Sequence, residues 1–159
     1  MTKRLTSDTL ILIGAAILTA AGVPEARAKR VLERLVNANL TGHDSHGIGM
    51  IPKYVEGLKG GTLDPNADMT MVRDNGSFLL IDGQRGFGQI IGEQAMQAAI
   101  KAAKSHRFAF LSLRNSYHIG RIGDWGEMAA AAGFISLHYV NVLSASALVA
   151  PFGGAAARF

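Results

Sequence analysis

Two short polar stretches carry the side chains most capable of chemistry. They are Asn115-Ser116-Tyr117-His118-Ile119-Gly120-Arg121-Ile122-Gly123 and Gly42-His43-Asp44-Ser45-His46-Gly47. Imidazole exchanges protons near neutral pH, so His118 is the best general acid or base that the first stretch offers. Gly120 and Gly123 allow a ligand to approach the backbone, and free amides at the start of a following helix would attract an anion. A lone loop histidine would be interpreted as a hydrogen-bonding residue, but the second, similar stretch favours a functional interpretation.

The second stretch allows more than one interpretation. Its histidines, His43 and His46, could share a helical face and bind a metal, but the flanking glycines argue against a helix. A metal site that also includes His118 is an alternative, although the spacing fixes no tetrahedral set of ligands. Asp44 or Ser45 could instead cap the short helix that follows. Capping is compatible with function, since one side chain can cap a helix while its neighbour faces a ligand.

Helices are predicted around this second stretch. Residues 5–21 form an amphipathic helix capped by Ser7, with an apolar stripe made of Leu10, Ile13, Ile17, Leu18 and Ala21. Pro24 and Glu25 begin the next helix, whose apolar face consists of Val31, Leu32, Leu35, Val36 and Leu40. A shorter helix is predicted over residues 50–58. The first two helices are expected to form a hairpin that packs on a larger body.

Strands alternate with helices after Gly60-Gly61. Residues 69–73 and 77–82 predict a β-hairpin through Asp74-Asn75-Gly76. The further predicted elements are a helix over 87–105, a strand over 108–113, a helix over 122–132, a strand over 134–142 and a turn at 150–154. The last strand–helix–strand set is expected to form a β-α-β unit, with the His118 loop between its strand and its helix. The glycines at 86, 88 and 92 lack the dinucleotide-binding spacing, which argues against a Rossmann fold.

Composition predicts a globular protein with a real core. The 159 residues are 48% apolar and 18% charged. The net charge is +4, and Lys and Arg are scattered along the chain, so a small anionic ligand is expected and not a nucleic acid. No apolar run reaches the length of about 18 residues that a membrane span needs, and the start lacks a signal-peptide pattern. The absence of cysteine excludes disulfides and thiolate metal sites, and a cytoplasmic location is expected.

Several sequence blocks together resemble the type-2 malate/L-lactate dehydrogenase family, most closely its hydroxycarboxylate dehydrogenase branch. These blocks are Ala38-Asn39-Leu40, Gly42 through Pro52, Asp82-Gly83 with Phe87-Gly88-Gln89, Asn115 through Gly123, Ala132-Gly133 and Ala150-Pro151-Phe152-Gly153-Gly154. They keep the family's order and spacing over nearly the whole chain. The resemblance implies a non-Rossmann α/β fold, in which an N-terminal helical region (residues 1–60) precedes the start of a mixed-sheet NAD(P)-binding domain (residues 61–159). It also implies a homodimer that uses NAD or NADP to interconvert 2-oxo and 2-hydroxy acids.

The same resemblance implies a role for individual residues. His118 resembles the catalytic acid–base, which protonates the carbonyl oxygen as hydride arrives from the nicotinamide. His46 and the segment Gly120-Arg121-Ile122 resemble cofactor contacts, and Ser45 resembles a residue of the substrate pocket. Arg121 and the amides beside it would suit a pyrophosphate or a substrate carboxylate. No metal is implied.

Two departures from the family pattern bear on function. Met50 stands where many members carry an arginine for the substrate carboxylate, and the hydroxycarboxylate branch shares this methionine. Family members are also roughly twice as long, so the chain resembles the N-terminal part of an enzyme and is expected to be inactive alone. Two alternatives stay open. One is a cyclic imino acid reductase on the same scaffold, and the other is a truncated, non-catalytic domain that self-associates.

Overall fold

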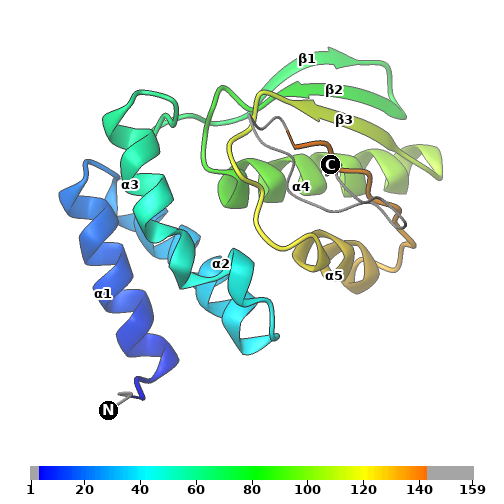
Figure 1. Cartoon of the computed structure of the whole chain (residues 1–159). Helices are drawn as coiled ribbons and strands as arrows, with labels where there is room; N and C mark the ends of the chain where they lie inside the picture. Colours follow the sequence, from blue (N-terminus) through cyan, green and yellow to red (C-terminus); the bar gives the residue numbers. More distant parts are fainter. Residues whose placement is uncertain (1–3, 143–159) are drawn as a thin grey trace, which may run out of the picture.

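The computed structural model describes residues 4–142, and the turn predicted at 150–154 lies outside them. The described chain has a mixed α/β fold, which confirms the predicted class (Figure 1). Its elements in order are α1 (Ser7–Ala20), α2 (Glu25–Leu40), the 3₁₀ turns η1 (Asp44–His46) and η2 (Ile48–Met50), α3 (Ile51–Lys59), β1 (Thr70–Asp74), β2 (Phe78–Asp82), α4 (Gly88–His106), β3 (Phe110–Arg114) and α5 (Gly123–Ala131). Helices α1 to α3 stand beside the sheet, α4 lies under it, and α5 lies beyond α4 (Figure 1).

Helices α1 and α2 form the predicted hairpin, but α1 packs through a different stripe. Its buried residues are Gly14, Ala15 and Leu18, of which only Leu18 belongs to the predicted stripe. The predicted core residues Ile13 and Ile17 are 48% and 44% exposed. The cause is Gly14, where an added Cβ would lie 2.3 Å from the side chain of Leu32. The two helices therefore approach most closely at a residue without a side chain, and that contact turns the larger residues outward.

Two predicted helix caps are wrong. Thr6 caps α1 by accepting a backbone N–H of the first turn at 3.2 Å, and Ser7 is the first helical residue. Neither Asp44 nor Ser45 caps α3, whose N-cap Met50 makes no side-chain cap bond. These side chains lie in η1, and η2 separates them from α3. The amides of His46, Gly47 and Met50 bond to carbonyl groups within the two turns, so the chain enters α3 already wound.

The sheet has the strand order β1-β2-β3. β1 and β2 form the predicted antiparallel hairpin, and the turn is closed by the Asp74 carboxylate, which accepts the Gly76 N–H at 2.9 Å. β2 and β3 are parallel, with α4 as the connection between them. The β-α-β unit is therefore β2-α4-β3 and not the unit predicted around α5.

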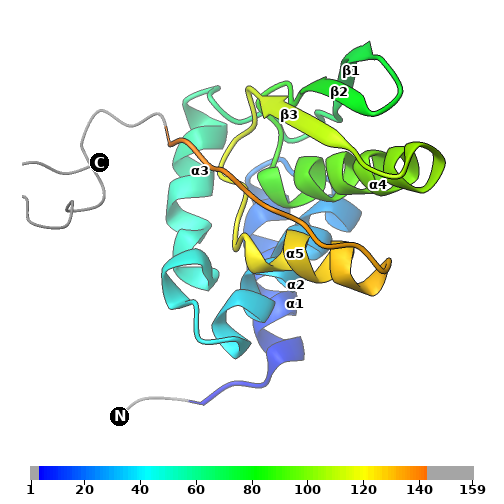
Figure 2. The ribbon, with the colours of Figure 1, turned by 90° about the vertical axis from the view of Figure 1, so that its right-hand side faces the viewer.

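Residues 134–142 do not form the predicted strand. They run back from the end of α5 without joining the sheet (Figure 2), and Ile135 and Tyr139 are 99% and 91% exposed. Alternating apolar residues favour an extended conformation, but a strand also needs an edge that accepts its hydrogen bonds. This segment pairs with no such edge within residues 4–142. No helix in that range is both long and apolar enough to cross a bilayer.

Candidate active site

The two polar stretches meet at their histidines. The rings of His46 and His118 lie 5.1 Å apart between centroids, and His43 packs against His46 at 5.4 Å. Ser45 Oγ lies 2.9 Å from Nδ1 of His46. On the other side, Tyr54 Oη of α3 lies 2.8 Å from Nδ1 of His118. The fold thus joins side chains from η1, α3 and the loop before α5.

Asn39, at the end of α2, holds the second stretch in place. Its amide donates to the Asp44 carboxylate at 2.6 Å, and its amide oxygen accepts the N–H of Ile48 at 2.9 Å. The close fit requires Gly47, because a Cβ there would lie 2.2 to 2.5 Å from the Asn39 side chain. Asn39 was not predicted to belong to the site, although its place three residues before Gly42 in a motif was the available signal.

The loop that carries His118 is built against the start of α4. An added Cβ at Gly88 would lie 2.2 Å from the carbonyl oxygen of His118 and 2.4 Å from Cα of Ile119. Before that point, the carboxylate of Asp82 accepts the side-chain amide of Asn115 at 2.9 Å and an N–H of Arg114 at 3.1 Å. These contacts attach the loop to the ends of β2 and β3 and to the first turn of α4.

A buried polar pair lies behind His118. Tyr54 and Gln89 are 0% and 1% exposed, and the Gln89 amide donates to Tyr54 Oη at 2.5 Å. The other amide atom, Gln89 Oε1, is buried and has no partner among residues 4–142. Neither residue was predicted to belong to the site. A tyrosine on the apolar face of a short helix is indistinguishable from a core residue in a sequence, and only the motif around Gln89 was a signal.

The surroundings of the two central histidines favour their neutral forms. Burial first, then the charges of His46 and Lys53, lower the pKa of His118 to about 4. Burial and His43 also lower the pKa of His46. Burial raises the pKa of Tyr54, which therefore stays protonated. At neutral pH His118 is an uncharged imidazole with Nδ1 engaged by Tyr54.

The segment Gly120-Arg121-Ile122 offers a ligand its backbone N–H groups, because the positive charge of Arg121 is already paired. Its three N–H groups have no hydrogen-bond partner within residues 4–142. The Arg121 guanidinium is paired with Asp124 at 2.7 Å and with Glu127 at 2.6 Å, both on α5. The carboxylate of Asp124 is in turn 3.7 Å from Arg34 of α2. The charge of Arg121 is thus used to hold the start of α5.

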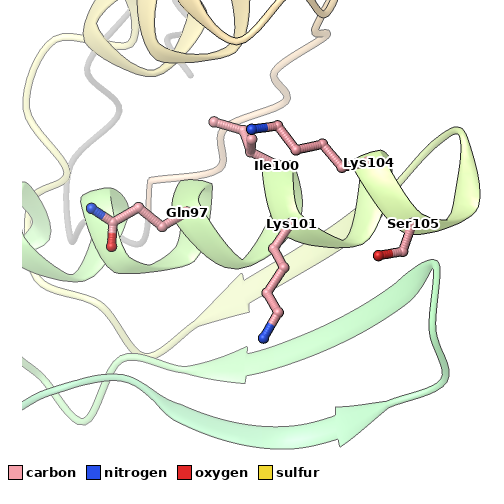
Figure 3. A pocket seen from close by; sticks show the side chains of 5 residues that line it. All are labelled: Gln97, Ile100, Lys101, Lys104 and Ser105. Carbon is pink, nitrogen blue, oxygen red and sulfur yellow. The ribbon is translucent and has the colours of Figure 1, made fainter.

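The described residues contain no set of three or more side chains placed to hold a metal ion. The three histidines pack ring against ring and do not converge on a point. A hollow of about 340 Å³ lies on α4 and is lined by Gln97, Ile100, Lys101, Lys104 and Ser105 (Figure 3). It lies along one helix and shares no residue with the histidine cluster, so we assign the site to the cluster.

Comparison with known proteins places the chain in a family. The sequence model of the family described as Malate/L-lactate dehydrogenase matches residues 5–159. Hydroxycarboxylate dehydrogenase B of Escherichia coli is 45% identical over 156 residues, which are 98% of this chain and 43% of that relative. The structure of malate dehydrogenase from Pyrococcus horikoshii has a TM-score of 0.77 at 38% identity, over 82% of this chain and 38% of that chain. For delta1-piperideine-2-carboxylate reductase from Pseudomonas syringae the TM-score is 0.73 at 28% identity, over 83% and 40%. The chain spans less than half the length of the relatives it matches.

Proposed function

The chain belongs to the malate/L-lactate dehydrogenase family, and from this premise we propose that it serves in hydride transfer between NAD(P) and 2-hydroxy or 2-oxo acids. The observation that carries the proposal is the cluster of His46, His118 and Tyr54, which three separate segments bring together. A buried imidazole with one nitrogen held and the other available is suited to proton exchange with a substrate oxygen. Hydroxycarboxylate dehydrogenase is the member type that we favour, because the most similar relatives include one of that name.

His118 would act as the acid and base of this reaction. Tyr54 occupies Nδ1, which leaves Nε2 as the nitrogen that faces a substrate. In reduction the imidazolium form of His118 would give its Nε2 proton to the carbonyl oxygen, which leaves a neutral ring with its hydrogen on Nδ1. In oxidation this Nδ1–H form would take the hydroxyl proton at Nε2. With a pKa of about 4, few His118 rings carry the extra proton that reduction needs at neutral pH. A substrate carboxylate near the ring would raise that pKa.

The residues present fit a nicotinamide cofactor. When bound, it would supply or accept the hydride. We propose that the free amides of Gly120, Arg121 and Ile122 hold an anionic group of the cofactor, while the guanidinium of Arg121 fixes the segment through α5. His46 would contact the cofactor beside His118. Ser45, which is hydrogen bonded to His46, would belong to the substrate pocket.

Met50 supports a preference among substrates. Its partly buried side chain packs against the core cluster, and it carries no charge that could pair with a second carboxylate. We propose that 2-oxo acids with an apolar or hydroxymethyl side chain are preferred over oxaloacetate. The choice between NAD and NADP, the homodimer, the division at residue 60 and the cytoplasmic location stay predictions.

Steady-state kinetics of the complete protein test the proposal. NADH and NADPH oxidation would be followed with hydroxypyruvate, phenylpyruvate, pyruvate and oxaloacetate. His118→Ala should lower kcat by about 10²–10⁴-fold, the usual contribution of general acid–base catalysis, with little change in cofactor affinity. His106→Ala, at the far end of α4, is the matched control. Near-normal turnover of His118→Ala would remove this residue from the mechanism.

The similarity to a piperideine-carboxylate reductase makes a cyclic imino acid reductase the second candidate. That reaction also delivers hydride to a carbon beside a carboxylate. Adding delta1-piperideine-2-carboxylate to the same assay separates the two, because the true substrate class should give the higher kcat/KM. Turnover of none of these substrates would support the non-catalytic alternative.

A further inference from the structure

The proton positions around Tyr54 determine which tautomer His118 adopts. A tyrosine hydroxyl has one hydrogen to donate, and Tyr54 is buried away from water. Gln89 already donates its amide N–H to Tyr54 Oη, so the hydroxyl hydrogen must point to another acceptor. Within residues 4–142 the acceptor in reach is Nδ1 of His118, at 2.8 Å. A neutral imidazole that accepts at Nδ1 carries its hydrogen on Nε2.

We propose that Gln89 and Tyr54 form a directional donor chain that holds neutral His118 in the Nε2–H tautomer, with Tyr54 as the positioning residue of the site. The catalytic meaning of this chain rests on the proposed function, whereas the tautomer itself does not. Tyr54 touches neither substrate nor cofactor in this scheme. It acts through His118: in the Nε2–H tautomer Nε2 donates a hydrogen bond to a substrate oxygen, and Nε2 can take a proton only in the reversed, Nδ1–H state of the chain.

The direction of the chain follows from which atoms it leaves unpaired. In the orientation that donates to Tyr54, Gln89 leaves its Oε1 and one hydrogen of its NH₂ group without a partner among residues 4–142. Turning the amide around would let Oε1 accept from Tyr54, but it would bury the NH₂ group with two unpaired hydrogens. Unpaired carbonyl oxygens are tolerated more often in protein interiors than unpaired N–H groups. The orientation that donates toward His118 is therefore the more stable one while His118 is neutral.

Protonation of His118 reverses the chain. An imidazolium carries a hydrogen on both nitrogens, so Nδ1 must then donate to Tyr54. Tyr54 must in turn donate onward, and in the described part of the chain the amide oxygen of Gln89 can accept once the amide has turned around. Other groups around the imidazole are His46 of η1 and Lys53 of α3, whose charges also favour the neutral form. The unpaired oxygen of Gln89 thus provides the second state of the chain.

Nitrogen NMR of the ¹⁵N-labelled 159-residue chain at pH 7 tests the proposal without cofactor or substrate. Long-range ¹H–¹⁵N correlations distinguish protonated from unprotonated ring nitrogens, and loss of signals in His118→Gln assigns them. The wild-type chain should show His118 with a protonated Nε2 and an unprotonated Nδ1. Tyr54→Phe keeps the ring but loses the donor, so the tautomers should mix and the pKa of His118 should rise by about 0.5 to 1.

Two further variants make the test specific. Tyr117→Phe removes a hydroxyl from the ring packed against Tyr54, and it should leave His118 unchanged. Gln89→Glu replaces the donor with a carboxylate, so it should convert His118 to the Nδ1–H tautomer. A wild-type Nδ1–H tautomer, or a Tyr54→Phe chain with unchanged tautomer and pKa, would overturn the proposal. An inactive complete protein that shows the predicted signals would refute the dehydrogenase function and leave the donor chain standing.

Discussion

Alanine at Gly88 perturbs the contact that fixes His118 without removing any functional group. The new Cβ would lie 2.2 Å from the carbonyl oxygen of His118 and 2.4 Å from Cα of Ile119. Both are backbone atoms, which cannot swing away as the end of a flexible side chain can. The loop must retreat from α4 by more than 1 Å before that oxygen reaches an ordinary contact distance of 3.4 Å.

The expected cost combines two opposing effects. Overpacking a close contact typically costs about 1–3 kcal/mol. The loss of glycine's flexibility in the unfolded chain offsets at most about 1 kcal/mol of this. Gly88→Ala should therefore lower the free energy of unfolding by about 1–2 kcal/mol. Because the displaced loop carries His118 away from Tyr54, the Nε2–H tautomer should also be lost, and turnover of the complete protein should fall by about 10²-fold.

Urea unfolding and the His118 nitrogen spectrum measure the two effects separately. Gly126→Ala in α5 is the matched control, because a Cβ there meets no atom within 4 Å. That control should gain about 0.5–1 kcal/mol from helix propensity and leave the His118 spectrum unchanged. If Gly88→Ala were as stable as Gly126→Ala and kept the tautomer, the packing of α4 against the His118 loop would not be what positions the imidazole.

Three further predictions concern pH, substrate choice and the ion pairs. Since the pKa of His118 falls from 6.5 to about 4 on folding, stability should be full above about pH 6.5 and decline toward pH 4 by on the order of 3 kcal/mol. Urea titrations across that range should show a flatter profile for His118→Gln. Met50→Arg should shift kcat/KM toward oxaloacetate, and an unchanged ranking of substrates would exclude Met50 from the pocket. Asp124→Asn, at a carboxylate 3% exposed, should cost about 3 kcal/mol in urea unfolding. Glu127→Gln, at one 64% exposed, should cost less than about 1 kcal/mol, and equal costs would contradict the burial argument.

Local signals account for the parts of the fold that the sequence predicted. The apolar period of α2, the turn at Asp74-Asn75-Gly76 and the long pattern of α4 each depend on residues close together in the chain, and all three elements form. The misplaced stripe of α1 and the missing strand at 134–142 depend on distant partners. Which face of α1 is buried is decided by Leu32 packing at Gly14, and whether residues 134–142 form a strand depends on an edge that the pattern does not reveal.

The residues of the site also differ in whether a local sequence signal marks them. Polar residues between glycines mark the two histidine stretches, whereas the residues that hold them resemble ordinary core or helix-end residues. Tyr54 contributes an aromatic ring to the core, where it packs against Phe87 at 5.6 Å, and a hydroxyl to His118. No sequence pattern distinguishes a tyrosine that only packs in the core from one whose hydroxyl also binds a histidine. A buried tyrosine four residues after Met50, on the helix that follows a histidine pair, is therefore worth testing as a hydrogen-bond donor whenever such a pair is found.

Arg121 shows how an ion pair changes what a motif can bind. An arginine between glycines favours a phosphate contact, but acidic residues three and six positions later lie on the same side of the helix that begins there. Asp124 and Glu127 pair with the guanidinium, and the hydrogen bond that Arg121 donates to Glu127 is the largest cause of its raised pKa. An anion that competed for this side chain would have to displace both carboxylates. The amides of Gly120, Arg121 and Ile122 have no such competitor in the described chain, so we propose that the backbone binds the anion and that the guanidinium has a structural role.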